Sequence, residues 1–98
     1  MFAKGYYVTA EIKANDGIPL GEIRKALVEL SEASAREPGC SLFLVHQDQR
    51  NPSHFVLWER FESEQDFKTH IAEPHTKKYG ALGYTEMVKA VQSDIIQE

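Results

Sequence analysis

The stretch CSLFLVHQDQRNPSHFVLWERFE, residues 40–62, decides the fold of this chain because it carries the two strongest strand signals. The runs 40–48 and 54–62 are rich in aliphatic and aromatic residues. The polar loop 49–53 between them contains asparagine and proline, which are typical of turns. The sequence therefore predicts a β-hairpin at this position.

The segments before and after the hairpin predict further elements. Residues 5–13 alternate apolar and polar side chains, as a strand does. From Pro19, apolar residues recur at intervals of three and four, which predicts an amphipathic helix that ends at the EPG sequence 37–39. Residues 63–72 predict a second helix, with Ser63 as its N-cap.

The C-terminal quarter is less regular. Residues 75–89, after Pro74, predict helix in pieces because two glycines weaken the run, and residues 90–97 predict a final strand. The order of elements is then β-α-β-β-α-β with an additional helical segment. We therefore expect an α+β, ferredoxin-like fold in a single domain, residues 1–98, with an antiparallel sheet and helices on one face.

Composition limits the class of protein. The chain has 98 residues and a net charge of -4, which argues against a nucleic-acid partner. No apolar run approaches the ~20 residues that cross a membrane, and the N-terminus lacks the apolar core of a secretory signal. A single cysteine, Cys40, excludes an intrachain disulfide and favours a cytoplasmic location. At the start of a strand, Cys40 is expected to be a small apolar side chain rather than a reactive thiol.

Both faces of the hairpin strands are apolar. Leu42 and Leu44 share one face of the first strand, Phe43 and Val45 share the other, and the second strand follows the same pattern. Because helices cover only one face, the other predicts a homodimer packed sheet to sheet about a two-fold axis. The alternative is that the C-terminal segment covers the second face.

Four histidines are candidates for chemistry. His70 and His75 flank Pro74, five positions apart, so they would lie about 140° apart on a straight helix, whereas paired helical ligands stand at i and i+4. No metal site is therefore predicted. His46 ends a strand and lines either a cavity or the surface, and His54 opens a strand beside a loop, where we expect it to be solvated.

The helical pattern places His70 beside a buried stripe and His75 in the first turn of a new helix, where the dipole disfavours an imidazolium. A neutral imidazole at a cavity edge can act as a base or a donor. The alternative is two half-buried histidines that satisfy backbone groups. Glu59 lies among apolar side chains and needs a partner or a role, such as orienting a histidine or pairing across a dimer. Trp58 is expected to lie in the core or in an interface rather than in a ligand site.

Residues 37–79 resemble the antibiotic biosynthesis monooxygenase (ABM) family, and most closely its small bacterial quinol-monooxygenase-like members. The resemblance is carried by EPGC, by the hairpin VHQD…NP…F, by WERFESEQDF and by the pair His70 and His75. It implies a dimeric α+β barrel with a cavity between sheet and helices in each protomer. It also implies oxidation of a quinol or polyphenol by molecular oxygen, without flavin, haem or metal.

The resemblance implies that His70 and His75 are the base and the orienting donor. It implies that substrate is contacted by four further residues: His46, Trp58, Glu59 and Tyr79. A related haem-degrading branch uses an Asn, a Trp and a His that this chain does not match, so no haem activity is expected. Two alternatives remain open: an isomerase of a small dicarbonyl or phosphorylated sugar-like metabolite, and a metabolite-binding dimer without turnover.

Overall fold

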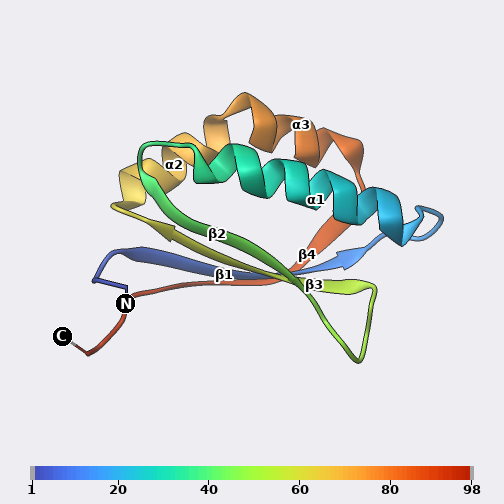
Figure 1. Cartoon of the computed structure of the whole chain (residues 1–98), viewed down its shortest axis with the longest axis horizontal. Helices are drawn as coiled ribbons and strands as arrows, with labels where there is room; N and C mark the ends of the chain where they lie inside the picture. The colour runs from blue at the N-terminus through green and yellow to red at the C-terminus, as the bar shows by residue number, and fades with distance from the viewer. Residues whose placement is uncertain (1, 98) are drawn as a thin grey trace.

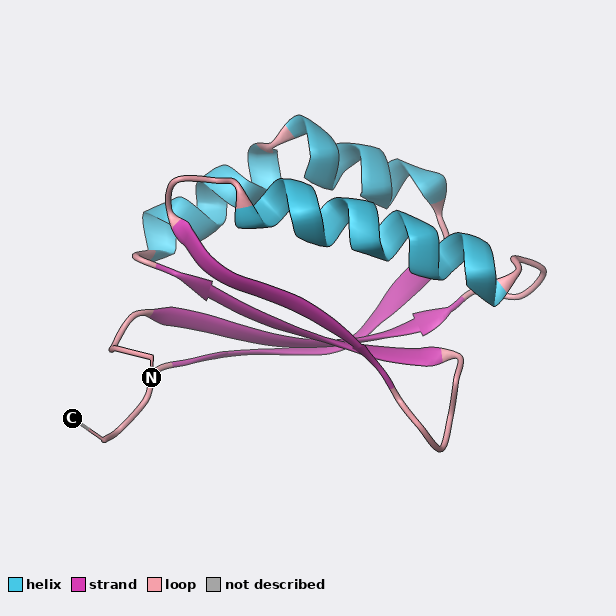
Figure 2. Ribbon diagram, in the orientation of Figure 1, coloured by secondary structure: helices cyan, strands magenta, loops and turns pink. Residues whose placement is uncertain are grey.

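The computed structural model describes residues 2–97 and contains one sheet and three helices (Figure 1). The elements are β1 (Tyr6–Ala14), α1 (Leu20–Ala35), β2 (Cys40–Gln47), β3 (His54–Phe61), α2 (Glu64–Ala72), α3 (Pro74–Leu82) and β4 (Thr85–Ser93). The sheet is antiparallel, with the strand order β2-β3-β1-β4. All three helices lie on one side of it (Figure 2). This is the α+β, ferredoxin-like arrangement that the sequence predicts.

The core lies between the sheet and α1, and the alternation of β1 explains why. Val8, Ala10 and Ile12 are buried, whereas Thr9 and Glu11 between them are exposed. The apolar stripe of α1 meets this surface. The other buried apolar side chains come from α1, β2 and β3: Ile23, Leu27, Leu30, Cys40, Phe43, Phe55, Leu57 and Phe61.

The connection between α2 and α3 is a sharp break one residue long. Glu73 adopts an extended conformation (φ -65°, ψ 145°), and Pro74 then occupies the first position of α3, where the absence of an N–H costs nothing. The helix α2 begins as predicted, because Ser63 Oγ accepts a hydrogen bond from the backbone N–H of Asp66 at 3.2 Å. The break turns the chain so that α3 starts in a new direction.

The predicted end of the third helix and the predicted bounds of the last strand were wrong. The expected helix through residue 89 stops at Leu82, and the strand expected at 90–97 runs instead from Thr85 to Ser93. Gly83, in a left-handed conformation (φ 65°), ends α3. The reason is tertiary: β1 offers a free edge that pairs with β4 along its length, and this outweighs local helix propensity.

The face of the sheet opposite the helices, the outer face, carries several exposed apolar side chains. Trp58 pairs with Leu44 on one side and with Thr9 on the other, and Thr9 pairs with Val91. Trp58 is 49% exposed, Leu44 48% and Val91 41%. The ring of His46 lies 4.3 Å from that of Trp58. The C-terminal segment extends the sheet as β4 and leaves these apolar side chains exposed.

Gly39 is required by a close contact at the corner between α1 and β2. A Cβ at this position would overlap the side chain of Asp66, which is fixed by its hydrogen bonds with Ser63. We expect Gly39→Ala to lower the free energy of unfolding by about 1–3 kcal/mol, measured by urea denaturation. Gly80→Ala is the control, because no described side chain lies within 4 Å of its Cβ position. An unchanged free energy of unfolding in Gly39→Ala would contradict the assignment.

Within residues 2–97, no helix has both the length and the apolar character needed to cross a membrane.

Candidate active site

A carboxylate held between two histidines forms the centre of the candidate site. Glu37 Oε2 lies 2.8 Å from His70 Nδ1 and 2.6 Å from His75 Nε2. The side chains of Glu37 and His70 are only 8% and 5% exposed, whereas that of His75 is 24% exposed. We call Glu37, His70 and His75 the Glu-His-His cluster. Its ligand-type atoms all lie within 4.8 Å of one another, so they are also close enough to share one metal ion.

Three different elements position the cluster. Glu37 follows the C-terminus of α1, His70 lies in the last turn of α2, and His75 lies in the first turn of α3. The extended residue Glu73 changes the direction of the chain between the two histidines, so their ring centres come to 6.2 Å. The straight-helix separation that argued against a shared site therefore does not apply.

The ring of His70 is held in an aromatic environment. Its centre lies 5.4 Å from that of Phe43, 5.2 Å from that of Phe61 and 6.4 Å from that of Phe67. Packing of this kind fixes the plane of the imidazole and excludes water from one side of it. The Thr76 hydroxyl lies 3.4 Å from His70 Nδ1, at the limit of a hydrogen bond. His70 is therefore a rigid, buried member of the cluster.

The hydrogen bonds assign the protons of the two imidazoles. An ionised carboxylate only accepts hydrogen bonds, so both ring nitrogens that face Glu37 carry a proton. In the neutral rings, His70 Nε2 and His75 Nδ1 are then left with their lone pairs. Because His75 is the more exposed of the two, its Nδ1 is the better placed base.

Glu59 lies on the other side of His70. Its Oε1 is 4.0 Å from His70 Nε2, which is too long for a hydrogen bond, and this oxygen has no hydrogen-bond partner among residues 2–97. Burial, together with the nearby charge of Glu37, raises the pKa of the Glu59 carboxyl to about 8. At neutral pH the Glu59 carboxyl is therefore mostly protonated.

Cys40 begins β2 near the cluster, but its thiol is not activated. Burial, with smaller contributions from the charges of Glu37 and Glu59, raises its pKa to about 11. The thiol Sγ lies 3.4 Å from the carbonyl oxygen of Leu42 and donates to it. A thiol that stays protonated is a poor nucleophile, so Cys40 is a structural side chain, as the sequence predicts.

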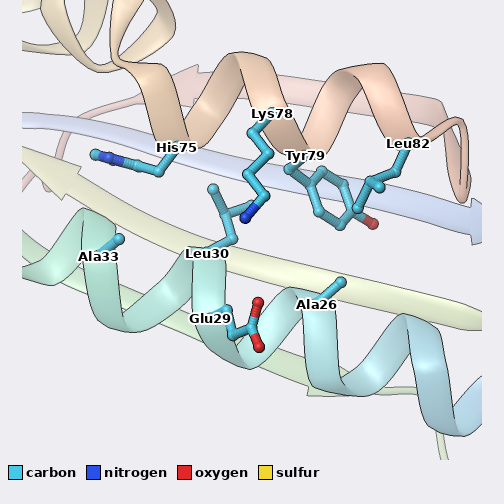
Figure 3. Close-up of a pocket in the computed structure, with 8 residues that line it drawn as sticks. All are labelled: Ala26, Glu29, Leu30, Ala33, His75, Lys78, Tyr79 and Leu82. Carbon is cyan, nitrogen blue, oxygen red and sulfur yellow. The ribbon is translucent and has the colours of Figure 1, made fainter.

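A pocket of about 200 Å³ lies between α1 and α3, with His75 at one end (Figure 3). Its lining is mostly apolar and comes from both helices: Ala26, Glu29, Leu30, Ala33, His75, Lys78, Tyr79 and Leu82. The Tyr79 hydroxyl is hydrogen-bonded to that of Thr85 at 2.7 Å, and burial raises its pKa. The expected cavity between sheet and helices is not this one, because no strand residue lines it.

The structure separates the predicted site residues into groups. Glu59 lies beside the cluster and Tyr79 lines the pocket, whereas His46 and Trp58 lie together on the outer face. His46 Nδ1 is buried and has no hydrogen-bond partner in the described part of the chain. The sequence missed Glu37 as a site residue. Two signals could have found it: its position at the corner between a predicted helix and a predicted strand, and its place in the EPGC sequence that carries the family resemblance.

Comparison with known proteins gives consistent matches. A family model described as antibiotic biosynthesis monooxygenase matches residues 5–82. The uncharacterized protein YjcS of Bacillus subtilis (strain 168) is 29% identical over 90 residues, which cover 92% of this chain and 86% of YjcS. A solved structure of a protein named YJCS has a TM-score of 0.85 at 29% identity, covering 92% of this chain and 97% of that one.

Two further solved structures share the fold at lower identity. One is described as an antibiotic biosynthesis monooxygenase, with a TM-score of 0.84 and 22% identity, covering 94% of this chain and 99% of that one. The other is Rv0793 from Mycobacterium tuberculosis, with a TM-score of 0.81 and 21% identity, covering 95% of this chain and 96% of that one.

Proposed function

Because the chain belongs to the antibiotic biosynthesis monooxygenase family, we propose that it oxidises a quinol or polyphenol with molecular oxygen and without a cofactor. The observation that carries the proposal is the position of Glu37, which hydrogen-bonds to both histidines beside an apolar pocket. A carboxylate in this position orients an imidazole base and stabilises the imidazolium that forms when the base takes a proton.

The proposed reaction begins with proton transfer. His75 Nδ1 removes a proton from a phenolic hydroxyl, and the charge of Glu37 compensates the imidazolium. The resulting anion is electron-rich enough to pass an electron to oxygen. One oxygen atom then enters the ring and the other leaves as water, while the quinol becomes a hydroxylated quinone and supplies all the electrons. The protein has to bind, deprotonate and exclude water.

The pocket supports a small, apolar substrate. Its volume of about 200 Å³ lies below the 300–1,000 Å³ that is usual for drug-sized ligands. Leucine and alanine side chains provide most of its walls, and the cation of Lys78 lies in the same lining. A phenolate formed beside His75 would gain from the nearby ammonium group.

Oxygen uptake tests the proposal. The native protein, with metal removed by a chelator, should consume oxygen in the presence of reduced menadione or of other quinols and polyphenols. The reduced menadione must be freed of dithionite, because dithionite itself consumes oxygen. Uptake above the uncatalysed rate, with a hydroxylated quinone as product, is expected. The absence of any uptake above background across these substrates would remove the monooxygenase proposal.

The second candidate is an isomerase, and the observation that favours it is Lys78 in the pocket lining, on the same helix as His75. A cation there could hold a phosphate or enolate oxygen while His75 moves a proton. Such an enzyme would exchange substrate hydrogen with deuterium from the solvent without consuming oxygen. Monitoring both deuterium exchange and oxygen uptake therefore separates the two reactions.

We also propose that two copies of the chain pack through their outer faces. Leu44, Trp58 and Val91 are exposed in one row that crosses the sheet from β2 to β4 and is interrupted only by Thr9, on a face where a soluble monomer usually carries polar side chains. Packing of one outer face on another would bury these side chains.

The change Trp58→Glu is expected to convert the dimer to a monomer, because it places a charge at the centre of the apolar row. Light scattering at micromolar concentration should give about twice the chain mass of 11.1 kDa for the native protein and the single chain mass for the variant. Val28→Glu is the matched control, since Val28 is exposed on α1, on the opposite side of the sheet. A native protein with the mass of a single chain would contradict the dimer proposal.

A further inference from the structure

We propose that Glu37, His70 and His75 form a binding site for a divalent first-row transition ion such as Zn²⁺. Two imidazoles and one carboxylate whose ligand atoms lie within 4.8 Å of one another are a donor set that such ions prefer. With neutral imidazoles the cluster has a net charge of -1, and that charge is largely buried. It therefore attracts a cation into a place where water competes weakly.

The distances are close to those that an ion requires. In tetrahedral coordination, metal–nitrogen and metal–oxygen bonds of about 2.0–2.2 Å place neighbouring ligand atoms about 3.3–3.6 Å apart. Glu37 Oε2 now lies 2.8 Å and 2.6 Å from the two ring nitrogens, and the three ligand atoms lie within 4.8 Å of one another, so the side chains would rotate to admit an ion between them. His75 is the exposed member and borders the pocket, so a water molecule can complete the coordination from that side.

Metal binding would exchange the tautomers of both rings. Each nitrogen that faces Glu37 gives up its proton to become a ligand, and a neutral ring then carries its proton on the other nitrogen. For His70 that nitrogen is Nε2, which faces Glu59 Oε1, a buried oxygen without a hydrogen-bond partner among residues 2–97. Metal-bound histidines usually donate this second N–H to a carboxylate. The ion would thus place an N–H opposite Glu59 Oε1, and the two atoms, now 4.0 Å apart, would have to approach by about 1 Å to form a hydrogen bond.

The same exchange affects His75 and rests on the proposed function. When Nε2 binds the ion, Nδ1 carries the proton and loses the lone pair that the proposed reaction uses. A bound ion and an active base therefore exclude each other at His75. On this account a divalent ion inhibits the oxygenase rather than assisting it.

The first experiment is isothermal titration calorimetry of the chelator-treated native protein with Zn²⁺, followed by nitrogen-resolved NMR of the four imidazoles. We expect one ion per chain, with the ring signals of His70 and His75 shifted to the opposite tautomers and those of His46 and His54 unchanged. The NMR experiment uses the native chain, so its result does not depend on a variant that folds. No binding, or binding that shifts only the other two histidines, would overturn the proposal.

The second experiment compares two variants that remove one ligand each. Glu37→Gln and His75→Asn should each lower the affinity for Zn²⁺ more than tenfold. Loss of a residue that only hydrogen-bonds to a metal ligand already costs about tenfold or more, and loss of the ligand itself should cost more. The control His54→Asn should bind as the native protein does. Native-like affinity in both ligand variants would overturn the metal site. Zinc binding in a protein that shows no oxygen uptake would instead leave the metal site standing and remove the proposed function.

Discussion

Replacement of His75 by alanine is expected to lower kcat for quinol oxidation by a factor of about 10²–10⁴, the usual contribution of a positioned general base. The substrate pocket is formed mainly by other side chains, so KM should change much less than kcat. His75 is 24% exposed and borders the pocket, so added imidazole can reach the vacated space. We therefore expect imidazole to restore part of the activity of His75→Ala.

Two related variants sharpen this test. His70→Ala should also lose activity, but imidazole should not restore it, because His70 is buried among Phe43, Phe61 and Phe67 and its loss leaves a cavity closed to solvent. His54→Ala should retain the native rate. Native-like turnover in His75→Ala would show that this imidazole is not the base.

The stability of the native protein should fall as the pH rises from about 4.5 to about 8, because of Glu59. Its pKa in the folded state, about 8, lies above the ordinary value of 4.5, so between these values the folded chain binds more protons than the unfolded chain. The slope from one such group approaches about 1.4 kcal/mol per pH unit, and the free energy of unfolding decreases with rising pH. The contribution of protonated Glu59 to stability is fully present below its pKa in the unfolded chain and is lost as the pH rises through its pKa in the folded chain.

Glu59→Gln should remove this dependence, because an amide of the same shape does not ionise. Urea denaturation at pH 5, 7 and 9 should show that the free energy of unfolding of the native protein falls relative to that of the variant as the pH rises. The slope of about 1.4 kcal/mol per pH unit sets the size of this difference at several kcal/mol. Glu32→Gln on the exposed surface of α1 is the control and should follow the native pH profile. Parallel profiles for Glu59→Gln and the native protein would mean that Glu59 is ionised in the fold.

Most of the fold could be predicted because its elements carry their signals locally. The alternation in residues 5–13, the stripe that follows Pro19 and the hairpin 40–62 each specify one element by its period. The register of β4 could not be read in this way. Residues 85–89 became strand because β1 lies beside them, and a pairing partner more than 70 residues away leaves no mark on the local pattern.

The site was predictable only in part for a similar reason. His70 and His75 could be chosen from their helical positions, and Glu59 from its place among apolar neighbours. Glu37 is 33 residues from His70 and 38 from His75 along the chain, and its contact with them depends on how α1 ends and on the turn at Glu73. Helical spacing predicts positions on a continuous helix, but the chain between His70 and His75 is broken at Glu73.

The pocket between α1 and α3 has one more consequence, for how this protein can diverge. The side chains of Glu37 and His70 are almost fully buried, whereas Glu29, Lys78 and Leu82 line the pocket from exposed positions on two helices. Substitutions at exposed helical positions usually change stability by less than about 0.5 kcal/mol. Selection can therefore reshape the exposed pocket walls for a new molecule while the buried pair Glu37 and His70 stays in place.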